Sequence, residues 1–421
     1  MIRTHIIPCK LPRARADALN RESGRVYTGV LVAHWRIVRK KGHWLSEKSA
    51  TRWSDTRTTA VMHAHTIDAA QQGFYKACVT TRALRKAGIA EARFPHWTKK
   101  FRTTIWKNTG IKRDGDALRL SCGGRTRKER EERAISIAIP AALRDALKFL
   151  EVRLVYDKLA RRHTWHLVVE NGKQAKQAPG SNVVSVDLGE IHPAVVGDTA
   201  EATVITCRER RAQSQGHARR LGKMAQALSR KKKGSRRHRR LVRAKARMKA
   251  KHHRVLRDIE HKVSRAIVDT AVDRKAARIV MGDVRDIADG GEKSKVQNGR
   301  MSRWDHGKIR TYVEYKAAAE GMKVALVDEH HTSQTCPSCG HRHKPRGRNF
   351  RCPSCGLQAH RDVVGQINIL SRFKEGAVGR LPAPPEVKYR IPHNLRVMRR
   401  CRDTGQASVP VARLRREAAG R

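Results

Sequence analysis

The sequence predicts an α/β protein, and three observations predict this fold class. Short apolar runs at residues 183–187, 194–197 and 203–207 are typical of an antiparallel meander. Helical and strand patterns then alternate up to about residue 370, as in a sheet completed by helices. Two CxxC pairs interrupt that alternation and predict a small metal-bound insertion.

The residue pattern of the first half of the chain predicts one strand, a helical stretch and a β-hairpin. Residues 1–8 are typical of a short strand, and a basic, helix-rich stretch follows. Within that stretch, residues 63–87 repeat apolar side chains at steps of three and four, which is helical spacing. Residues 150–170 alternate around a polar turn and predict the hairpin. Residues 174–182 carry Pro, Gly and Ser without periodicity, so they are predicted to link two domains.

The second half continues with a basic helical hairpin that turns near Gly234 and Ser235. Residues 219–257 hold 18 Lys and Arg and no Asp or Glu. The returning helix keeps an apolar stripe at a four-residue step from Val255 to Ala271, so one face packs and the other is cationic. The other predicted elements are strands at residues 278–281 and 323–328, a helix ending near residue 321, and a helix from about residue 363.

The composition indicates a polyanionic partner. The 421 residues include 92 Lys and Arg against 38 Asp and Glu, a formal net charge of +54. Because such a charge repels itself in the free protein, nucleic acid is the expected partner. No apolar run approaches the ~18 residues of a membrane helix, and the N-terminus lacks a secretion signal. We therefore expect neither membrane insertion nor secretion.

Two CPSCG motifs, with twelve residues between their CxxC pairs, predict a structural zinc site. Zinc takes four soft ligands in a tetrahedron, and each motif presents two thiolates on a turn that its glycine permits. The alternative is a pair of redox dithiols, although the regular repeat favours zinc. His341 and His343 lie between the pairs and are expected at the surface. The predicted ligands are Cys336, Cys339, Cys352 and Cys355.

Two aspartates stand at the ends of predicted elements. Asp187 ends the apolar run VVSVD, and Asp362 directly precedes the last predicted helix. Such an aspartate is often only a turn former. Two-metal phosphodiester cleavage, however, needs carboxylates from separate strands around Mg²⁺ ions about 4 Å apart. The predicted order of elements is compatible with the RNase H architecture, in which acids converge in this way.

The basic hairpin predicts contact with phosphates. Its cations repel one another strongly unless a counter-ion is present, which favours contact with phosphates. The alternative is a helix face that is merely exposed to solvent. Phosphate contacts supply affinity and register rather than sequence recognition. The predicted contact residues are Lys231, Lys232, Lys233, Arg236, Arg237, Arg239 and Arg240.

Four motifs follow one another in the second half: VSVDLG at 184–189, TSQTCPSCG at 332–340, CPSCG at 352–356 and HRDVVGQINIL at 360–370. In combination they resemble the TnpB family of transposon-encoded RNA-guided nucleases, relatives of compact type V CRISPR effectors. The resemblance covers roughly residues 180–372. Residues 1–180 resemble the family only loosely, through their length, a basic helical insertion and the stretch FPHWTKKF at 94–101.

The resemblance implies a RuvC-like nuclease domain with an inserted zinc ribbon, preceded by a β-barrel wedge domain that carries a helical recognition insertion. It also implies a guide RNA and a double-stranded DNA target beside a short flanking motif. Asp187 would be the first catalytic carboxylate and Asp362 the last. The implied domains are the wedge at 1–12 and 91–180, the helical insertion at 13–90, the RuvC-like domain at 181–331 and 357–375 (with the basic hairpin at 208–275) and the ribbon at 332–356. After Pro382 the sequence is Arg-rich with sparse periodicity, so the basic tail at 376–421 is expected to be partly disordered.

One position departs from the family's pattern. The family's middle motif ends a strand in Glu-Asp-Leu, and here Gly282 stands in place of the glutamate, before Asp283. Two aspartates alone hold two Mg²⁺ ions poorly, so we expect a replacement acid at the end of a neighbouring strand. Glu329 is favoured, since it follows the strand at 323–328. Asp283 is the reserve, because consecutive residues on a strand point to opposite faces.

The sequence therefore predicts an Mg²⁺-dependent, RNA-guided DNA endonuclease, encoded by a transposon or acting as a small CRISPR effector. Its expected magnesium ligands are Asp187, Glu329 and Asp362. The alternatives are a nuclease-inactive, RNA-guided repressor and a cut-and-paste transposase. We expect no membrane and no required protein partner, and a location in the bacterial cytoplasm, at the nucleoid when bound to DNA.

The stretch at 94–101 is the candidate for reading the duplex that flanks the target. It combines Lys99 and Lys100, which suit phosphates, with Trp97 and Phe101. The two aromatic side chains are suited either to stacking on bases or to packing in the core, and both interpretations stay open at this point.

Overall fold

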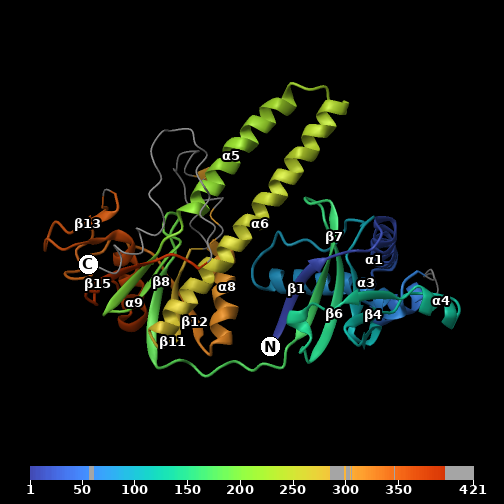
Figure 1. Ribbon diagram of the computed structural model, residues 1–421, viewed down its shortest axis with the longest axis horizontal. Helices are drawn as coiled ribbons and strands as arrows, with labels where there is room; N and C mark the ends of the chain where they lie inside the picture. Colours follow the sequence, from blue (N-terminus) through green and yellow to red (C-terminus); the bar gives the residue numbers. More distant parts are fainter. Residues whose placement is uncertain (56–60, 285–297, 300–303, 305, 346, 394–421) are drawn as a thin grey trace. The chain divides into compact units, whose positions relative to one another are not determined.

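The computed structural model describes residues 1–55, 61–284, 298–299, 304, 306–345 and 347–393. The chain divides into two compact units. The first comprises residues 1–176 and 227–251, and the second comprises residues 177–226 and 252–421 (Figure 1).

The first unit contains two antiparallel sheets and a group of helices. The four-stranded sheet has the order β1 (Ile2–Pro8), β7 (Arg162–Glu170), β6 (Lys148–Asp157) and β2 (Thr104–Lys107). The three-stranded sheet consists of β3 (Ile111–Asp114), β4 (Ala117–Leu120) and β5 (Ile135–Ala138). The helices of this unit are α1 (Arg13–Lys41), α2 (Glu47–Asp55), α3 (Ala64–Lys86) and α4 (Arg127–Glu132). The predicted first strand, the helix at 63–87 and the hairpin at 150–170 are confirmed, while a closed wedge barrel stays a prediction.

The helices α1 and α3 cover this unit because their apolar stripes share one core with the strands. Leu19 of α1 and Ile67 of α3 pack in the same buried cluster as Trp106 of β2 and Trp165 of β7. The two tryptophan rings meet edge to face at 5.7 Å. Burial of each such side chain contributes about 1.5–3 kcal/mol, so the core fixes the helices on the sheet.

The second unit is built on a six-stranded mixed sheet. Its order is β12 (Lys323–Asp328), β11 (Ala276–Asp283), β8 (Asn182–Asp187), β9 (Ala194–Gly197), β10 (Glu201–Ile205) and β15 (Glu386–Arg390). The strands β8, β9 and β10 pair in antiparallel fashion, so the predicted meander is confirmed. β11 then runs parallel to β8, and β12 runs parallel to β11, which brings the ends of these three strands to one edge.

Helices cover both faces of this sheet. On one face, Val186 of β8 and Met281 of β11 pack with Ile267 of α6 (Arg236–Asp273) and Val313 of α8 (His306–Ala319). On the other face lies α9 (Arg361–Glu375), which contacts β8, β9, β11 and β12. The residues of β8 that do not enter the first core therefore face α9.

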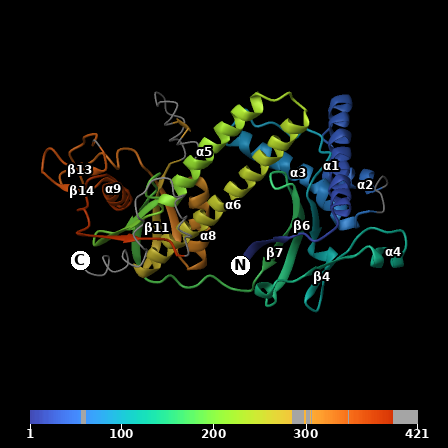
Figure 2. The same cartoon turned by 45° about the horizontal axis from the view of Figure 1, so that its top comes forward.

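The basic hairpin consists of α5 (Arg208–Ser229) and α6, which run antiparallel to each other in both views (Figures 1 and 2). The turn between them contains Gly234 with a φ of +84°, a conformation that favours glycine. His217 of α5 and His252 of α6 stack with 3.7 Å between ring centroids. The predicted hairpin and its turn are confirmed.

Within the tail that was expected to be partly disordered, Glu386–Arg390 forms an ordered strand, β15, which pairs in parallel with β10. Two charged contacts explain the order of this strand. Arg390 donates to Asp273 over 2.7 Å, and Lys388 donates to Glu201 over 2.7 Å. The rest of the predicted tail, residues 394–421, lies outside the described residues.

Candidate active site

The acids predicted to bind metal lie on the face of the six-stranded sheet that α9 covers. Along β8, Val184 and Val186 point into the opposite core, so Asp187 points toward α9. Gly365 of α9 leaves room for that carboxylate, since a Cβ at residue 365 would lie 2.5 Å from Asp187 Oδ2. Asp362 lies in the first turn of the same helix. The first turns of α9 thus contribute one acid and make space for another.

Glu329 fills the space that a side chain at residue 282 would occupy. Gly282 pairs with Val327 across the parallel strands β11 and β12, so Glu329, two residues further, projects from the same face as Val327. A Cβ added to Gly282 would overlap the Glu329 side chain, including its carboxylate. The missing side chain at Gly282 therefore leaves the space that the side chain of Glu329 fills.

Asp283 is directed away from this group. It alternates with Gly282 along β11, and its Oδ1 lies 3.9 Å from Nη1 of Arg310 on α8, which covers the opposite face of the sheet. Of the two acids predicted as replacements for the middle carboxylate, Glu329 is the one that the structure places beside Asp187. The catalytic roles of both stay predictions.

The acids interact electrostatically. Burial, and then the charge of Asp362, raise the pKa of Asp187 to about 7. Burial, and then the charges of Asp187, Asp283 and Asp328, raise the pKa of Glu329 to about 9. Like charges in a partly dehydrated site favour the neutral acids, so a divalent cation would relieve this repulsion.

Hydrogen bonds from the neighbouring motifs fix the backbone at Glu329. Its carbonyl oxygen accepts from the Thr332 amide over 3.1 Å and from the Thr332 hydroxyl over 2.9 Å. The buried side chain of Asn368 on α9 donates to the carbonyls of Thr332 and Thr335, each over 2.7 Å. The sequence reasoning missed Asn368, although a polar residue within the buried face of a helix was an available signal.

Asp362 is held from two sides. Its Oδ2 accepts from Nη1 of Arg348 over 2.8 Å, and its backbone amide donates to Nδ1 of His360, which caps α9, over 3.2 Å. Arg348 lies between the two cysteine pairs, directly before β13 (Asn349–Arg351). The cysteine-containing segment is thereby connected to the acidic site, a contact that the sequence reasoning did not foresee.

The acidic donor set suits Mg²⁺. Asp187, Glu329 and Asp362 offer only carboxylate oxygens, the hard ligands that Mg²⁺ prefers. Oε1 of Glu329 is buried and has no hydrogen-bond partner among the described residues. An orphaned, buried carboxylate oxygen is costly unless it is protonated or paired with a cation. The donor chemistry of these residues therefore suits a hard divalent cation, although the three carboxylates do not all lie within 4.8 Å of one another.

The two cysteine motifs form matching turns. Gly340 N donates to Cys336 O over 3.0 Å, and Gly356 N donates to Cys352 O over 3.1 Å. Both glycines have positive φ, +73° and +74° respectively, so the predicted need for glycine is confirmed. The hairpin of β13 and β14 (Gln358–His360) supports the turns with a small core around Phe350.

The four thiols converge on one point. Sγ of Cys336 lies 3.6 Å from Sγ of Cys355, and Sγ of Cys339 lies 3.5 Å from Sγ of Cys352. All four sulfurs lie within 4.8 Å of one another. Four thiolates at zinc–sulfur distances of about 2.3 Å give separations of this size, so the cluster has the geometry of a closed Cys₄ zinc site. His341 and His343 do not belong to it.

The predicted phosphate contacts lie around the turn of the basic hairpin. Residues 227–251 of the hairpin belong to the first unit. There a hollow of about 410 Å³ is lined by Arg161, Lys233, Gly234, His238, Arg239, Val242 and Arg243. Two of the predicted cations, Lys233 and Arg239, thus line a concave and strongly positive surface.

The stretch at 94–101 is fixed along α1 and exposes one aromatic ring. Thr28 of α1 accepts from the Lys99 amide over 2.9 Å, and Trp35 of α1 donates to Pro95 O over 2.7 Å. Trp97 is 72% exposed, so the interpretation as a core residue is wrong for it. Phe101 packs edge to face on Tyr156 at 5.3 Å.

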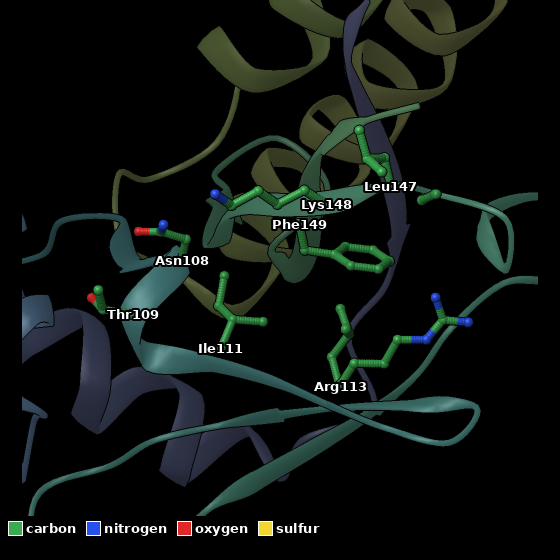
Figure 3. A pocket seen from close by; sticks show the side chains of 9 residues that line it. Asn108, Thr109, Ile111, Arg113, Leu147, Lys148 and Phe149 are labelled. Carbon is green, nitrogen blue, oxygen red and sulfur yellow. The ribbon is translucent and has the colours of Figure 1, made fainter. Parts of the chain in front are cut away.

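A second hollow, of about 270 Å³, lies in the first unit (Figure 3). Its walls include the apolar side chains of Ile111 and Phe149 and the cations Arg113 and Lys148. It contains none of the residues that the sequence predicted as functional. No helix among the described residues is long and apolar enough to cross a membrane.

Two segments of the chain match described families of known proteins. Residues 166–288 match the family described as "Probable transposase", and residues 306–369 match the family described as "Cas12f1-like, TNB domain". The second match includes both cysteine pairs, Glu329 and Asp362. The first includes Asp187 and the whole basic hairpin.

Individual relatives agree with these families. A TnpB-like protein of Methanocaldococcus jannaschii is 33% identical over 133 residues, which are 31% of this chain and 47% of the relative. A protein of Escherichia coli named "Putative RNA-guided DNA endonuclease InsQ" is 28% identical over 225 residues, 49% of this chain and 53% of the relative. The chain thus spans about half the length of these curated relatives.

The fold has a counterpart among solved structures. The cryo-EM structure of a Cas12f1–sgRNA–target DNA complex has a protein chain that matches with a TM-score of 0.59 and 13% identity. The match covers 85% of this chain and 81% of that chain, so the likeness extends over both units. The family matches and the relatives together support the resemblance of this part of the chain to the TnpB family.

Proposed function

We propose that the protein is an RNA-guided DNA endonuclease whose RuvC-like site is formed by Asp187, Glu329 and Asp362. The observation that carries the proposal is the arrangement of Glu329 in the space above Gly282, beside Asp187. It supplies the third carboxylate that a two-metal site needs. The names of relatives, which include an RNA-guided DNA endonuclease and a CRISPR-associated endodeoxyribonuclease, support the same function.

In this proposal the three acids bind Mg²⁺, which when bound would stabilise the attacking and leaving oxygens of an in-line displacement. The protein's contribution is to hold the carboxylates in place. Asn368 and Thr332 fix Glu329, Gly365 leaves room for Asp187, and Arg348 orients Asp362. A rigid acidic site of this kind lowers the cost of bringing the metals and the phosphodiester together.

The proposed partners are a guide RNA and a double-stranded DNA target. Residues 181–331 and 357–375, which include β8 to β12 and α9, would form the RuvC-like domain, and residues 332–356 would form the zinc ribbon. The first unit would contain the wedge at 1–12 and 91–180 and the recognition insertion at 13–90. Base pairing with the guide would supply specificity for the target sequence, and the protein would read the flanking motif.

The basic hairpin is expected to bind RNA through phosphates. Replacing the cations of its turn with Ala is expected to weaken RNA binding and to flatten the dependence of log K on log salt by about 0.7–0.9 per lost contact, because fewer counterions are released. The replaced residues are Lys231, Lys232, Lys233, Arg236 and Arg237. Binding titrations at several salt concentrations measure the slope. An unchanged slope would mean that the turn is only a solvated surface.

The exposed ring of Trp97 is expected to contact nucleic acid. Trp97→Ala removes a stacking surface worth about 1–3 kcal/mol per base and is expected to weaken target binding about 5- to 150-fold without unfolding the protein, because the ring is largely exposed. Lys99→Ala tests the neighbouring cation, and Leu147→Ala, an exposed apolar residue elsewhere in this unit, serves as a control. Unchanged affinity and flanking-motif preference in the Trp97 and Lys99 variants would place the contact elsewhere.

The experiment that tests the proposed function starts with the RNA that copurifies with the protein. Its sequence defines a matching target, which is placed in a plasmid beside a randomised flank and incubated with the ribonucleoprotein and Mg²⁺. We expect linear plasmid only when target and RNA match. Target binding without cutting in Mg²⁺ or Mn²⁺ would favour the repressor, the candidate suggested by Gly282. Joining of the cut ends to a second DNA would indicate a transposase.

A further inference from the structure

We propose that His192, His360 and Asp362 form a binding site for a divalent transition-metal ion, next to the acidic Mg²⁺ site. One ligand atom from each of the three side chains lies within 4.8 Å of the other two. The inference deepens the proposed nuclease function, on which it rests, because Asp362 belongs to both sites. It identifies the metal preference that the site would have.

A tight loop brings His192 back to the start of α9. Gly189 follows β8, and a Cβ at this position would lie 2.5 Å from the carbonyl oxygen of His192, so the loop requires glycine. The His192 and His360 rings lie 5.4 Å apart at an angle of 66°. Nδ1 of His192 is buried and accepts no hydrogen bond from any described residue. A buried imidazole nitrogen without a partner is a donor available to a metal.

His360 also offers a lone pair. Its Nδ1 accepts the backbone N–H of Asp362 over 3.2 Å, so this nitrogen carries no proton in the neutral ring. The contact is at the long end of hydrogen-bond distances, and a metal ion competes readily for such a lone pair. Asp362 uses Oδ2 for Arg348. Its second oxygen remains to serve as the carboxylate ligand.

The chemistry of this donor set selects a class of metal. Two imidazole nitrogens and one carboxylate suit Mn²⁺, Fe²⁺, Co²⁺ and Zn²⁺, whereas Mg²⁺ takes oxygen ligands. Asp187 and Glu329 supply oxygens only. The two neighbouring metal positions share Asp362, but one has only oxygen ligands and the other has two nitrogen ligands. We therefore expect the position with the histidines to hold a transition metal in the presence of excess Mg²⁺.

The test uses the ribonucleoprotein with one zinc ion per chain, held by the four cysteines, produced with ¹⁵N-labelled histidine and titrated with Mn²⁺ in excess Mg²⁺. Pulsed electron paramagnetic resonance then detects ¹⁵N coupled to Mn²⁺, and the label separates protein imidazoles from the unlabelled RNA. We expect ¹⁵N couplings in the wild type, and a loss of at least about tenfold in Mn²⁺ affinity at this position in His192→Gln and in His360→Asn. Asparagine is itself a good helix cap, so the second variant keeps α9 capped. His43→Asn, at an exposed histidine after α1, is the matched control.

The outcomes separate this inference from the proposed function. Bound Mn²⁺ without ¹⁵N coupling, or couplings that survive in both variants, would overturn the transition-metal site even if the protein cuts DNA. Couplings that disappear in the His192 and His360 variants but persist in His43→Asn would support it, even if the wild type does not cut. Glu329→Gln is expected to keep the ¹⁵N couplings, since Glu329 lies outside this donor set.

Discussion

Glu329→Gln is expected to reduce DNA cleavage by roughly 10²-fold or more while RNA and target binding stay within a few-fold, as when a group that stabilises the transition state electrostatically is removed. Glutamine is nearly isosteric and keeps the packing above Gly282, but it carries no charge. A cleavage time course on matched plasmid gives the rate, and a filter-binding titration on the same sample gives the affinity.

Asp283→Asn is the matched control for this prediction. Asp283 is adjacent to Gly282 in sequence, but its carboxylate lies 3.9 Å from Arg310 on the other face of the sheet. We therefore expect cleavage by this variant within a few-fold of the wild type. Full cutting by Glu329→Gln together with loss of cutting in Asp283→Asn would assign the middle acid to residue 283 instead.

Cys352→Ser is expected to release the zinc and to unfold the ribbon. Cys352 is buried beside Phe350, and the apparent binding free energy of structural zinc sites, about 10–16 kcal/mol, is also folding free energy. Because Arg348 of the ribbon holds Asp362, we also expect cleavage to fall when the metal is lost. Elemental analysis gives zinc per chain, and thermal unfolding gives the loss of stability.

Cys9→Ser in the first unit is the control for the zinc experiment, since Cys9 lies outside the Cys₄ cluster. It should retain one zinc per chain and a similar unfolding temperature. If the wild type contained no zinc, the four cysteines would act as redox dithiols instead. If Cys352→Ser kept its zinc, the metal would be bound by other residues of the chain.

The features that the sequence predicted well depend on local patterns. The strand Lys323–Asp328 has the predicted bounds, because a short apolar run between a helix and a turn is a local signal. The cysteine turns were predicted from spacing alone, since each CPSCG motif closes on itself. Asp187 and Asp362 were identified by their positions at the ends of elements, and the topology places Asp187 on the face that α9 covers and Asp362 in the first turn of α9.

The features that escaped prediction depend on contacts between distant segments. His192 meets His360 only because a loop after β8 returns to α9, which no spacing in the sequence reveals. Arg348 reaches Asp362 across the base of the ribbon. The strand β15 is stabilised by pairing with β10, which lies 181 or more positions earlier in the chain. Its own apolar pattern is sparse, and the sequence therefore suggested disorder there.

Moving the acid back to the strand tests the central claim that Glu329 replaces a carboxylate at residue 282. The variant Glu329→Gly empties the space above Gly282, and the double variant Gly282→Glu with Glu329→Gly fills it from β11. The measurement is the cleavage rate of both variants on matched plasmid in Mg²⁺. We predict no cutting by Glu329→Gly alone and renewed cutting by the double variant. Cutting by Glu329→Gly at the wild-type rate would contradict the claim.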